Sequence, residues 1–138
     1  MLNMNFSLKR KAHLKLGRRG ENLSCELLKS KGMVILARNF RTQFGELDIV
    51  ARDGGMIVFV EVKTLHRIGR FRPVDNYKHR QMQRNLRAAR EYIRLIDGQH
   101  LRMRYDFIEV ILPKAGFMKI HHYMDFIRMS DMRYWHGK

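Results

Sequence analysis

The sequence is poor in the features that mark secreted and membrane-spanning proteins. Cys25 is its only cysteine, so no internal disulfide can form, which is typical of a reducing cytoplasm. The basic N-terminus lacks the apolar segment of a signal peptide, and no apolar run approaches the length needed to span a membrane. With 138 residues, 45% of them hydrophobic, the chain predicts one globular cytoplasmic domain with no membrane partner.

Acidic residues are also scarce, because 13 Asp and Glu stand against 28 Lys and Arg, for a formal net charge of +15. This excess favours a polyanionic partner, with nucleic acid ahead of an anionic membrane surface. Three of the few acids, Glu46, Asp48 and Glu61, nevertheless lie in one short stretch. A strongly basic protein that gathers carboxylates in one place is expected to use them.

That stretch, residues 44–63, predicts a β-hairpin. Two apolar runs flank Asp53-Gly54, a dipeptide typical of the turn between antiparallel strands. A two-residue loop at this dipeptide would place Glu46 opposite Glu61, with Asp48 one diagonal step away on the same face. A three-residue loop without a bulge would instead move Asp48 to the other face.

The charges on this hairpin need a compensating partner. Glu61 and Lys63 alternate with valines, so both side chains point to one face of the strand. Like charges that face each other across a sheet destabilise it, and a buried Glu or Lys rarely lacks a partner. A divalent cation with oxygen ligands would supply that partner. The alternative is a purely structural ion pair of Glu61 with Lys63.

The same residues carry a resemblance to a known family. Asp48, followed by Glu61-Val62-Lys63 on the next strand, resembles the D…ExK signature of the restriction-endonuclease-like, or PD-(D/E)xK, nuclease superfamily. The neighbouring segments 17–21, 38–41 and 45–51 resemble the YraN-type family of small bacterial nuclease-like proteins. That family is similar in its core to archaeal Holliday-junction resolvases. The match covers most of the chain and is strongest in its first half.

The resemblance implies a metal-dependent DNA nuclease with Mg²⁺ or Mn²⁺ as its cofactor. Asp48 and Glu61, with Glu21 from the first helix, would be the metal ligands. Asp48, Glu61 and Lys63 would form the catalytic set. Glu21 has a simpler explanation as an acid favoured by the positive end of a helix. Glu46 lies beside the set, where a rim salt bridge to an arginine would also explain it.

Basic and amide side chains outside this cluster are candidates for contacts to DNA. The resemblance places a Lys or Gln near the metal on the long helix, where Lys78 and Gln81 are the local candidates. Arginines at a flexible helix start and in a basic loop suit phosphate contacts, although exposed arginines need no such role. The residues expected to bind nucleic acid are Arg18, Arg19, Arg38, Arg41 and Lys78.

The order of the expected elements predicts an α/β sandwich. These elements are helix 15–31, strand 33–37, the central hairpin, helix 75–96, strand 104–112, a strand at 118–122 and helix 123–129. Together with the resemblance, this order implies a restriction-endonuclease-like three-layer sandwich whose mixed central sheet is flanked by helices. Residues 15–129 would form this single domain, between a flexible basic arm at 1–14 and a tail at 130–138.

Three functions stay open for such a protein. A nuclease would use the Asp48, Glu61 and Lys63 set for phosphodiester hydrolysis, and the likeness to junction resolvases suggests branched DNA and a homodimer. An accessory protein would bind nucleic acid through the same fold without turnover. An adaptor would bind protein, and its basic surface would be incidental. A steep loss of DNA affinity with salt separates the first two functions from the third.

Overall fold

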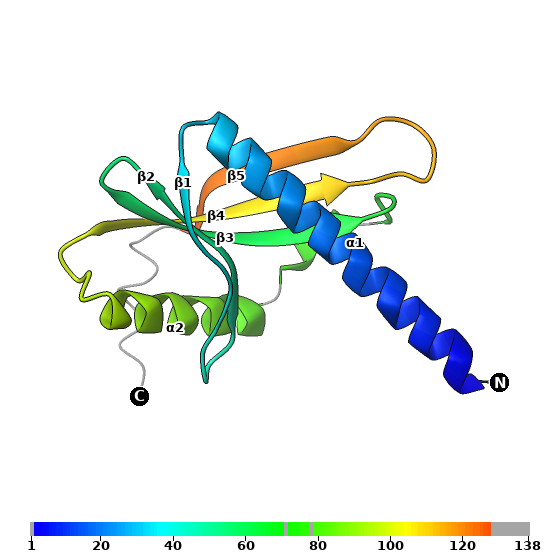
Figure 1. Cartoon of the computed structure of the whole chain (residues 1–138), viewed down its shortest axis with the longest axis horizontal. Helices are drawn as coiled ribbons and strands as arrows, with labels where there is room; N and C mark the ends of the chain where they lie inside the picture. Colours follow the sequence, from blue (N-terminus) through cyan, green and yellow to red (C-terminus); the bar gives the residue numbers. More distant parts are fainter. Residues whose placement is uncertain (1, 71, 78, 128–138) are drawn as a thin grey trace.

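The computed structural model describes residues 2–70, 72–77 and 79–127, which form a five-stranded sheet with a helix on each face (Figure 1). The elements are α1 (Leu2–Ser30), β1 (Val34–Arg41), β2 (Glu46–Asp53), β3 (Met56–Leu65), the 3₁₀ helix η1 (Pro73–Asn76), α2 (His79–Leu95), β4 (Arg102–Ile111) and β5 (Lys119–Ile127). The strands lie in sequence order, and only β3 and β4 run parallel. The sheet is therefore mixed, as expected, with α2 in the crossover between the parallel strands.

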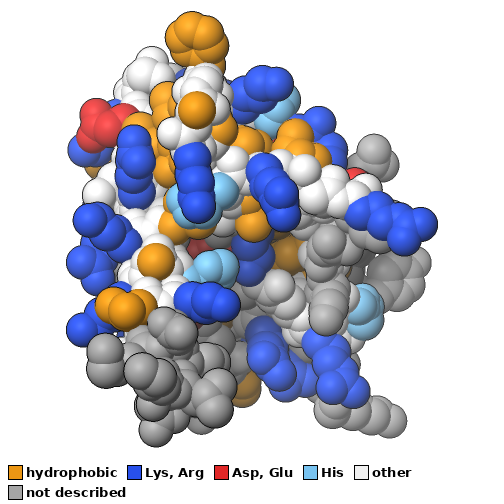
Figure 2. Space-filling model, turned by 90° about the vertical axis from the view of Figure 1, so that its right-hand side faces the viewer, with side chains coloured by type: hydrophobic (Ala, Val, Ile, Leu, Met, Phe, Trp, Pro, Cys, Tyr) orange, Lys and Arg blue, Asp and Glu red, His pale blue; other side chains and the backbone are white. Residues whose placement is uncertain are grey.

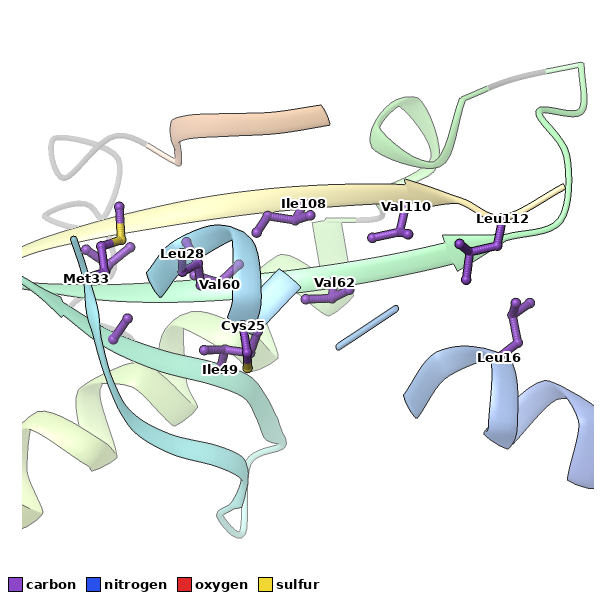
Figure 3. Close-up of a cluster of buried hydrophobic side chains, with 12 residues drawn as sticks. Leu16, Cys25, Leu28, Met33, Ile49, Val60, Val62, Ile108, Val110 and Leu112 are labelled. Atoms are coloured by element: carbon purple, nitrogen blue, oxygen red, sulfur yellow. The ribbon is translucent and has the colours of Figure 1, made fainter. Parts of the chain in front are cut away.

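The first core lies between α1 and the sheet. Leu16, Cys25 and Leu28 face the sheet from α1 and are buried, and Figure 3 shows them with side chains of the strands, among them Val60 and Ile108. Burial raises the pKa of the Cys25 thiol, which suits a packing residue and not a nucleophile. Among the described residues, no helix is long and apolar enough to cross a membrane.

The second core lies between α2 and the opposite face of the sheet. Leu86, Ala89 and Ile93 of α2 pack on this face. The Phe59 ring of β3 lies 5.9 Å from the Tyr92 ring, centroid to centroid. Because both faces of β3 are covered, its side chains are apolar on both sides over Ile57–Val60. Glu61 comes directly after this buried run.

Three elements differ from the sequence-based expectation. Residues 2–14, expected as a flexible arm, continue α1, because their Leu, Lys, Arg and Ala residues favour a helix and no Gly or Pro interrupts them. Residues 38–41, expected as a loop, belong to β1. Residues 123–127, expected as a helix, belong to β5, where aromatic and β-branched side chains suit pairing with β4. The expected tail at 130–138 lies outside the described residues.

The β2–β3 hairpin corrects the predicted register. Asp53 pairs with Met56, so the loop is Gly54-Gly55, one residue later than expected. Gly54 has a φ of +59°, which glycine adopts without steric cost. The pairing is thereby shifted by two residues, which preserves the face of each side chain. The last pair of this register is Ile49 with Val60. If the register is continued by one residue on each strand, Asp48 lies level with Glu61.

Candidate active site

The two strands of the hairpin separate where the acids begin. Their pairing ends at Ile49 and Val60, and Asp48 and Glu61 are the next residues on each strand. The backbone N–H of Val62, past the last pair, donates a 2.9 Å hydrogen bond to Asp48 Oδ2. The Asp48 side chain therefore takes the place of a strand partner, and this bond fixes its carboxylate against β3.

Glu61 is 4% exposed, and each of its carboxylate oxygens has an amide donor from α2. Gln81 Nε2 donates to Oε1 over 2.8 Å, and Asn85 Nδ2 donates to Oε2 over 3.2 Å. Asn85 also donates to the Tyr77 hydroxyl. Lys63 Nζ lies 3.6 Å from Oε1, and its side chain is 43% exposed. The Glu61 carboxylate is thus held between α2 and Lys63.

Burial shifts the pKa of both carboxyl groups upward. It raises the pKa of Glu61 to about 8, and the nearby Asp48 charge adds to this effect while Lys63 opposes it. Burial also raises the pKa of Asp48, against the lowering effect of the Val62 N–H. A hydrogen bond between the two carboxyl groups favours the shared proton on Glu61. Two carboxyl groups that keep a proton near neutral pH form a place where a cation can replace it.

The acids open into a pocket of about 560 Å³. The residues that line it are Gly45, Glu46, Asp48, Glu61, Val62, Lys63, Arg80, Gln81, Arg84 and Asn85. A smaller pocket of about 150 Å³ follows along α2 and shares Arg80 and Arg84 with the first. A ligand in this region would meet carboxylates on the sheet and guanidinium groups on α2.

Glu21 lies near the acid pair but does not complete a ligand group with it. Gly20 brings α1 into direct contact with Thr64 of β3, and burial, followed by the Asp48 charge, raises the pKa of Glu21. Arg38 Nη2 lies 3.9 Å from Glu21 Oε2. Among the described residues, no three His, Cys, Asp or Glu side chains form a group that could hold a metal. The role of Glu21 as a third ligand stays a prediction.

The remaining predicted residues are spread around this centre. Glu46 lines the pocket and lies opposite Arg41 in the β1–β2 register. Arg18 and Arg19 are exposed on α1. Lys78 lies outside the described residues. The structure thus brings Asp48, Glu61, Lys63, Gln81 and Glu46 together and leaves the predicted arginines outside the pocket.

Three residues of α2 that shape the site were not among the predicted site residues. Asn85 is a buried amide on Glu61, and Arg80 and Arg84 line the pocket. The available signal was the four-residue spacing, since Gln81 and Asn85 lie one helical turn apart on one face. Arg80 and Arg84 repeat the same spacing beside them. The spacing alone does not predict which strand the Gln81 and Asn85 face of the helix contacts.

Residues 20–110, more than half of the chain, match the model of the family described as Uncharacterised protein family UPF0102. The chain belongs to the UPF0102 family. UPF0102 is the YraN family and lies within the restriction-endonuclease-like superfamily, so the resemblance inferred from the sequence motifs is confirmed. The matched segment includes Glu21, Asp48, Glu61 and Lys63, and it begins within α1.

Individual UPF0102 proteins cover most of the chain. The UPF0102 protein of Dictyoglomus turgidum is 34% identical over 101 residues, which cover 73% of this chain and 86% of that protein. That of Chlorobaculum parvum is 35% identical over 108 residues, covering 78% and 84%. That of Nocardia farcinica is 38% identical over 107 residues, again covering 78% and 84%. Their names state the family and no activity.

Proposed function

We propose that this UPF0102 protein is a divalent-metal-dependent nuclease that hydrolyses phosphodiester bonds in DNA. The observation that carries the proposal is the pair of half-buried Asp48 and buried Glu61 with Lys63 beside it, in a pocket lined by two arginines of α2. UPF0102 is described as uncharacterised, so the proposal rests on the chemistry of this site and on its superfamily.

Asp48 and Glu61 fit Mg²⁺ or Mn²⁺ as ligands. Both are carboxylates, and Mg²⁺ commonly takes only one or two protein carboxylates while waters and substrate phosphate supply its other ligands. When bound, such an ion lowers the pKa of a water and neutralises charge that develops on the phosphate. The upward pKa shifts of both acids, which burial causes first of all, support this fit, because a cation would offset the cost of ionising the two carboxyl groups away from water. Glu21 would have to leave Arg38 to join them.

Lys63 is the residue that we assign to the reacting phosphate. Its ammonium is partly exposed at the pocket and is tethered to Glu61. From there it can donate hydrogen bonds to an attacking water or to the negative charge of the transition state. Gln81 and Asn85 hold both oxygens of Glu61, so we assign them to the orientation of that carboxylate and not to proton transfer.

Arginines on α2 supply the contacts that a DNA backbone needs at this site. Arg80 and Arg84 line both pockets, and guanidinium groups suit phosphate because they donate two parallel hydrogen bonds. Of the arginines expected from the sequence, Arg38 donates to Asn22 over 2.6 Å. We propose that the predicted arginines contact phosphates farther from the cleaved bond. Branched DNA as substrate and a homodimer as the active species are also part of this proposal.

The alternative is a nucleic-acid-binding accessory protein that has the fold without turnover. The observation in its favour is that the described residues contain no group of three or more potential metal ligands. In that case Lys63 and the hydrogen bonds from the α2 amides would serve only to stabilise the acid pair. The two functions share the DNA surface and differ in whether a metal replaces the proton of the acid pair.

The deciding experiment is a cleavage assay with labelled linear, flapped and four-way-junction DNA in Mg²⁺, Mn²⁺ or EDTA. Lys63→Ala should lower the cleavage rate by at least about tenfold, which corresponds to about 1.4 kcal/mol of barrier. Asp48→Asn should abolish metal-dependent cleavage. Lys114→Ala removes an exposed lysine of the β4–β5 loop and should cleave like the wild type.

The same proteins separate the two functions. Metal-dependent cutting that slows at least about tenfold in Lys63→Ala, disappears in Asp48→Asn and persists in Lys114→Ala would support the nuclease. Salt-sensitive DNA binding without cutting in any protein would support the accessory function. Cutting that persists equally in all the variants would assign the activity to a contaminant or to another site, and the proposal for this pocket would be wrong.

A further inference from the structure

Residues 7–15 of α1 pack on no surface formed by the described residues. Leu16 is 8% exposed, whereas every residue from 7 to 15, here called the projecting segment, is exposed. Figure 1 shows this part of the helix extending beyond the sheet, and the UPF0102 match begins only at residue 20. Helices in proteins owe most of their stability to a packed face, so the projecting segment is a surface in need of a partner.

The charge of this region is of one sign. Between Lys9 and Gly20 there is no acid, and the first acid of the chain is Glu21. Because an α-helix turns by about 100° per residue, the cations spread around most of its circumference. Figure 2 looks onto the side from which α1 projects, where Lys and Arg are the dominant charged side chains. The cations of this helix half are Lys9, Arg10, Lys11, Lys15, Arg18 and Arg19.

Two other partners fit this surface poorly. The exposed apolar side chains Leu8 and Leu14, 60% and 59% exposed, are six residues apart and therefore point about 120° away from each other. An interfacial membrane helix needs one continuous apolar face, and a coiled coil with a second copy needs an apolar seam. Helices of the same positive charge would also repel each other. The surface instead complements a regular row of negative charges.

We infer that the projecting segment binds the sugar-phosphate backbone of a DNA duplex whose other end enters the active-site pocket. The part about the pocket rests on the proposed function. Lys9 lies twelve residues before Glu21, which interacts with Asp48, and this spacing spans about 18 Å along the helix axis. A DNA strand advances by 3.4 Å per base pair, so the segment reaches phosphates about five base pairs from the cleaved bond. The preferred substrate therefore carries a duplex arm of at least that length.

A binding experiment in EDTA, where no cleavage can occur, tests this inference. Fluorescence anisotropy measures the affinity for hairpin-capped duplexes of increasing length at several salt concentrations. In the triple variant Lys9→Ala/Arg10→Ala/Lys11→Ala, the slope of log affinity against log salt should fall by about 0.9 for each phosphate that the variant no longer neutralises. The difference from wild type should vanish on duplexes too short to reach the segment. Ala favours helix, so circular dichroism should show unchanged helix content.

The matched control is Lys29→Ala/Arg52→Ala/Arg102→Ala, which removes three exposed cations elsewhere on the protein. It should leave the salt slope unchanged. Equal decreases in both triple variants would reduce the effect to net charge and overturn the inference. The inference would also be overturned if the variant Lys9→Ala/Arg10→Ala/Lys11→Ala kept its DNA affinity but lost binding to phosphatidylserine vesicles. The same holds if this variant kept its DNA affinity but lost dimerisation in sedimentation experiments. If wild type binds in this way but never cleaves, DNA binding by the projecting segment stands, while the proposed nuclease function and the part of the inference about the pocket fail.

Discussion

Gly20 is the residue at which α1 comes closest to the sheet. A Cβ added there would lie 1.7 Å from Thr64 Oγ1 and 2.7 Å from Thr64 Cβ, so the helix or the strand would have to move. Thr64 Oγ1 is buried and, among the described residues, has no hydrogen-bond partner, and such tightly packed surroundings leave little room to adjust. This contact determines where the next residue, Glu21, lies relative to Asp48.

Gly20→Ala should lower the free energy of unfolding by about 1–3 kcal/mol, because overpacking outweighs the gain in helix propensity. Gly17→Ala is the matched control, since an added Cβ at Gly17 meets nothing within 4 Å. It should raise the free energy of unfolding by up to about 1 kcal/mol. Urea unfolding followed by circular dichroism measures both. Equal values for the two variants would show that the Thr64 contact does not hold α1.

Strands β4 and β5 are joined by a buried carboxylate as well as by backbone hydrogen bonds. The register of their ladder shifts beside Asp106, which is fully buried. Arg104 donates two hydrogen bonds to it, the Asp125 N–H donates a third, and His122 Nε2 lies 2.8 Å from Oδ2. Burial alone would raise the pKa of Asp106, but these partners outweigh it and lower the pKa. The carboxylate thus stabilises an irregular part of the ladder.

Asp106→Asn should lower the free energy of unfolding by about 1–3 kcal/mol at neutral pH, because Arg104 would lose this partner and keep only its 3.3 Å pair with Asp53. The wild-type contribution is present above the ordinary pKa of 3.8 and is lost as the pH falls through the lower folded value. The gap between the proteins in urea unfolding should therefore narrow in acid. Glu91→Gln breaks an exposed pair with Arg94 and should change nothing measurable. A pH-independent gap would contradict the ionic role of Asp106.

Among the described residues, three acids lie where the fold excludes water, namely Glu61, Asp106 and Glu109. Glu61 is buried although the chain has a formal net charge of +15. Its amide partners on α2 follow it in the sequence by 20 and 24 residues. The metal-free fold therefore carries a destabilising pair of acids in its centre. Such a cost is typical of a binding site and not of a part built for stability.

The metal-free protein should lose stability as the pH rises from about 4.5 to about 8. The folded pKa of Glu61 is about 8 against an ordinary value of 4.5, so its contribution is present below 4.5 and is lost as the pH rises through 8. The upper limit of the loss is about 1.4 kcal/mol per pKa unit. Mn²⁺ should restore stability at pH 8, and the gain should increase with the logarithm of its concentration. Urea unfolding in EDTA or Mn²⁺ measures both effects, and Glu61→Gln should remove both.

The sequence by itself determined the family of the protein and predicted the strand that carries Glu61 and Lys63. Alternation of charged and apolar residues around Glu61 and Lys63 predicts a strand with reactive side chains on one face, since strand periodicity is a local property. The Asp53 to Gly55 stretch likewise predicts a hairpin. Excess Lys and Arg indicate a polyanionic partner. These inferences need only near neighbours in the chain.

The tertiary structure decided everything that depends on distant contacts. Because the loop is Gly54-Gly55, Asp48 is the residue that lies level with Glu61. Asn85 reaches the Glu61 carboxylate only because α2 packs on the sheet. The last strand formed where a helix was expected, because pairing with β4 outweighs local preference. Packing and register join residues far apart in sequence, and their free energies exceed the small local propensities from which a sequence is interpreted.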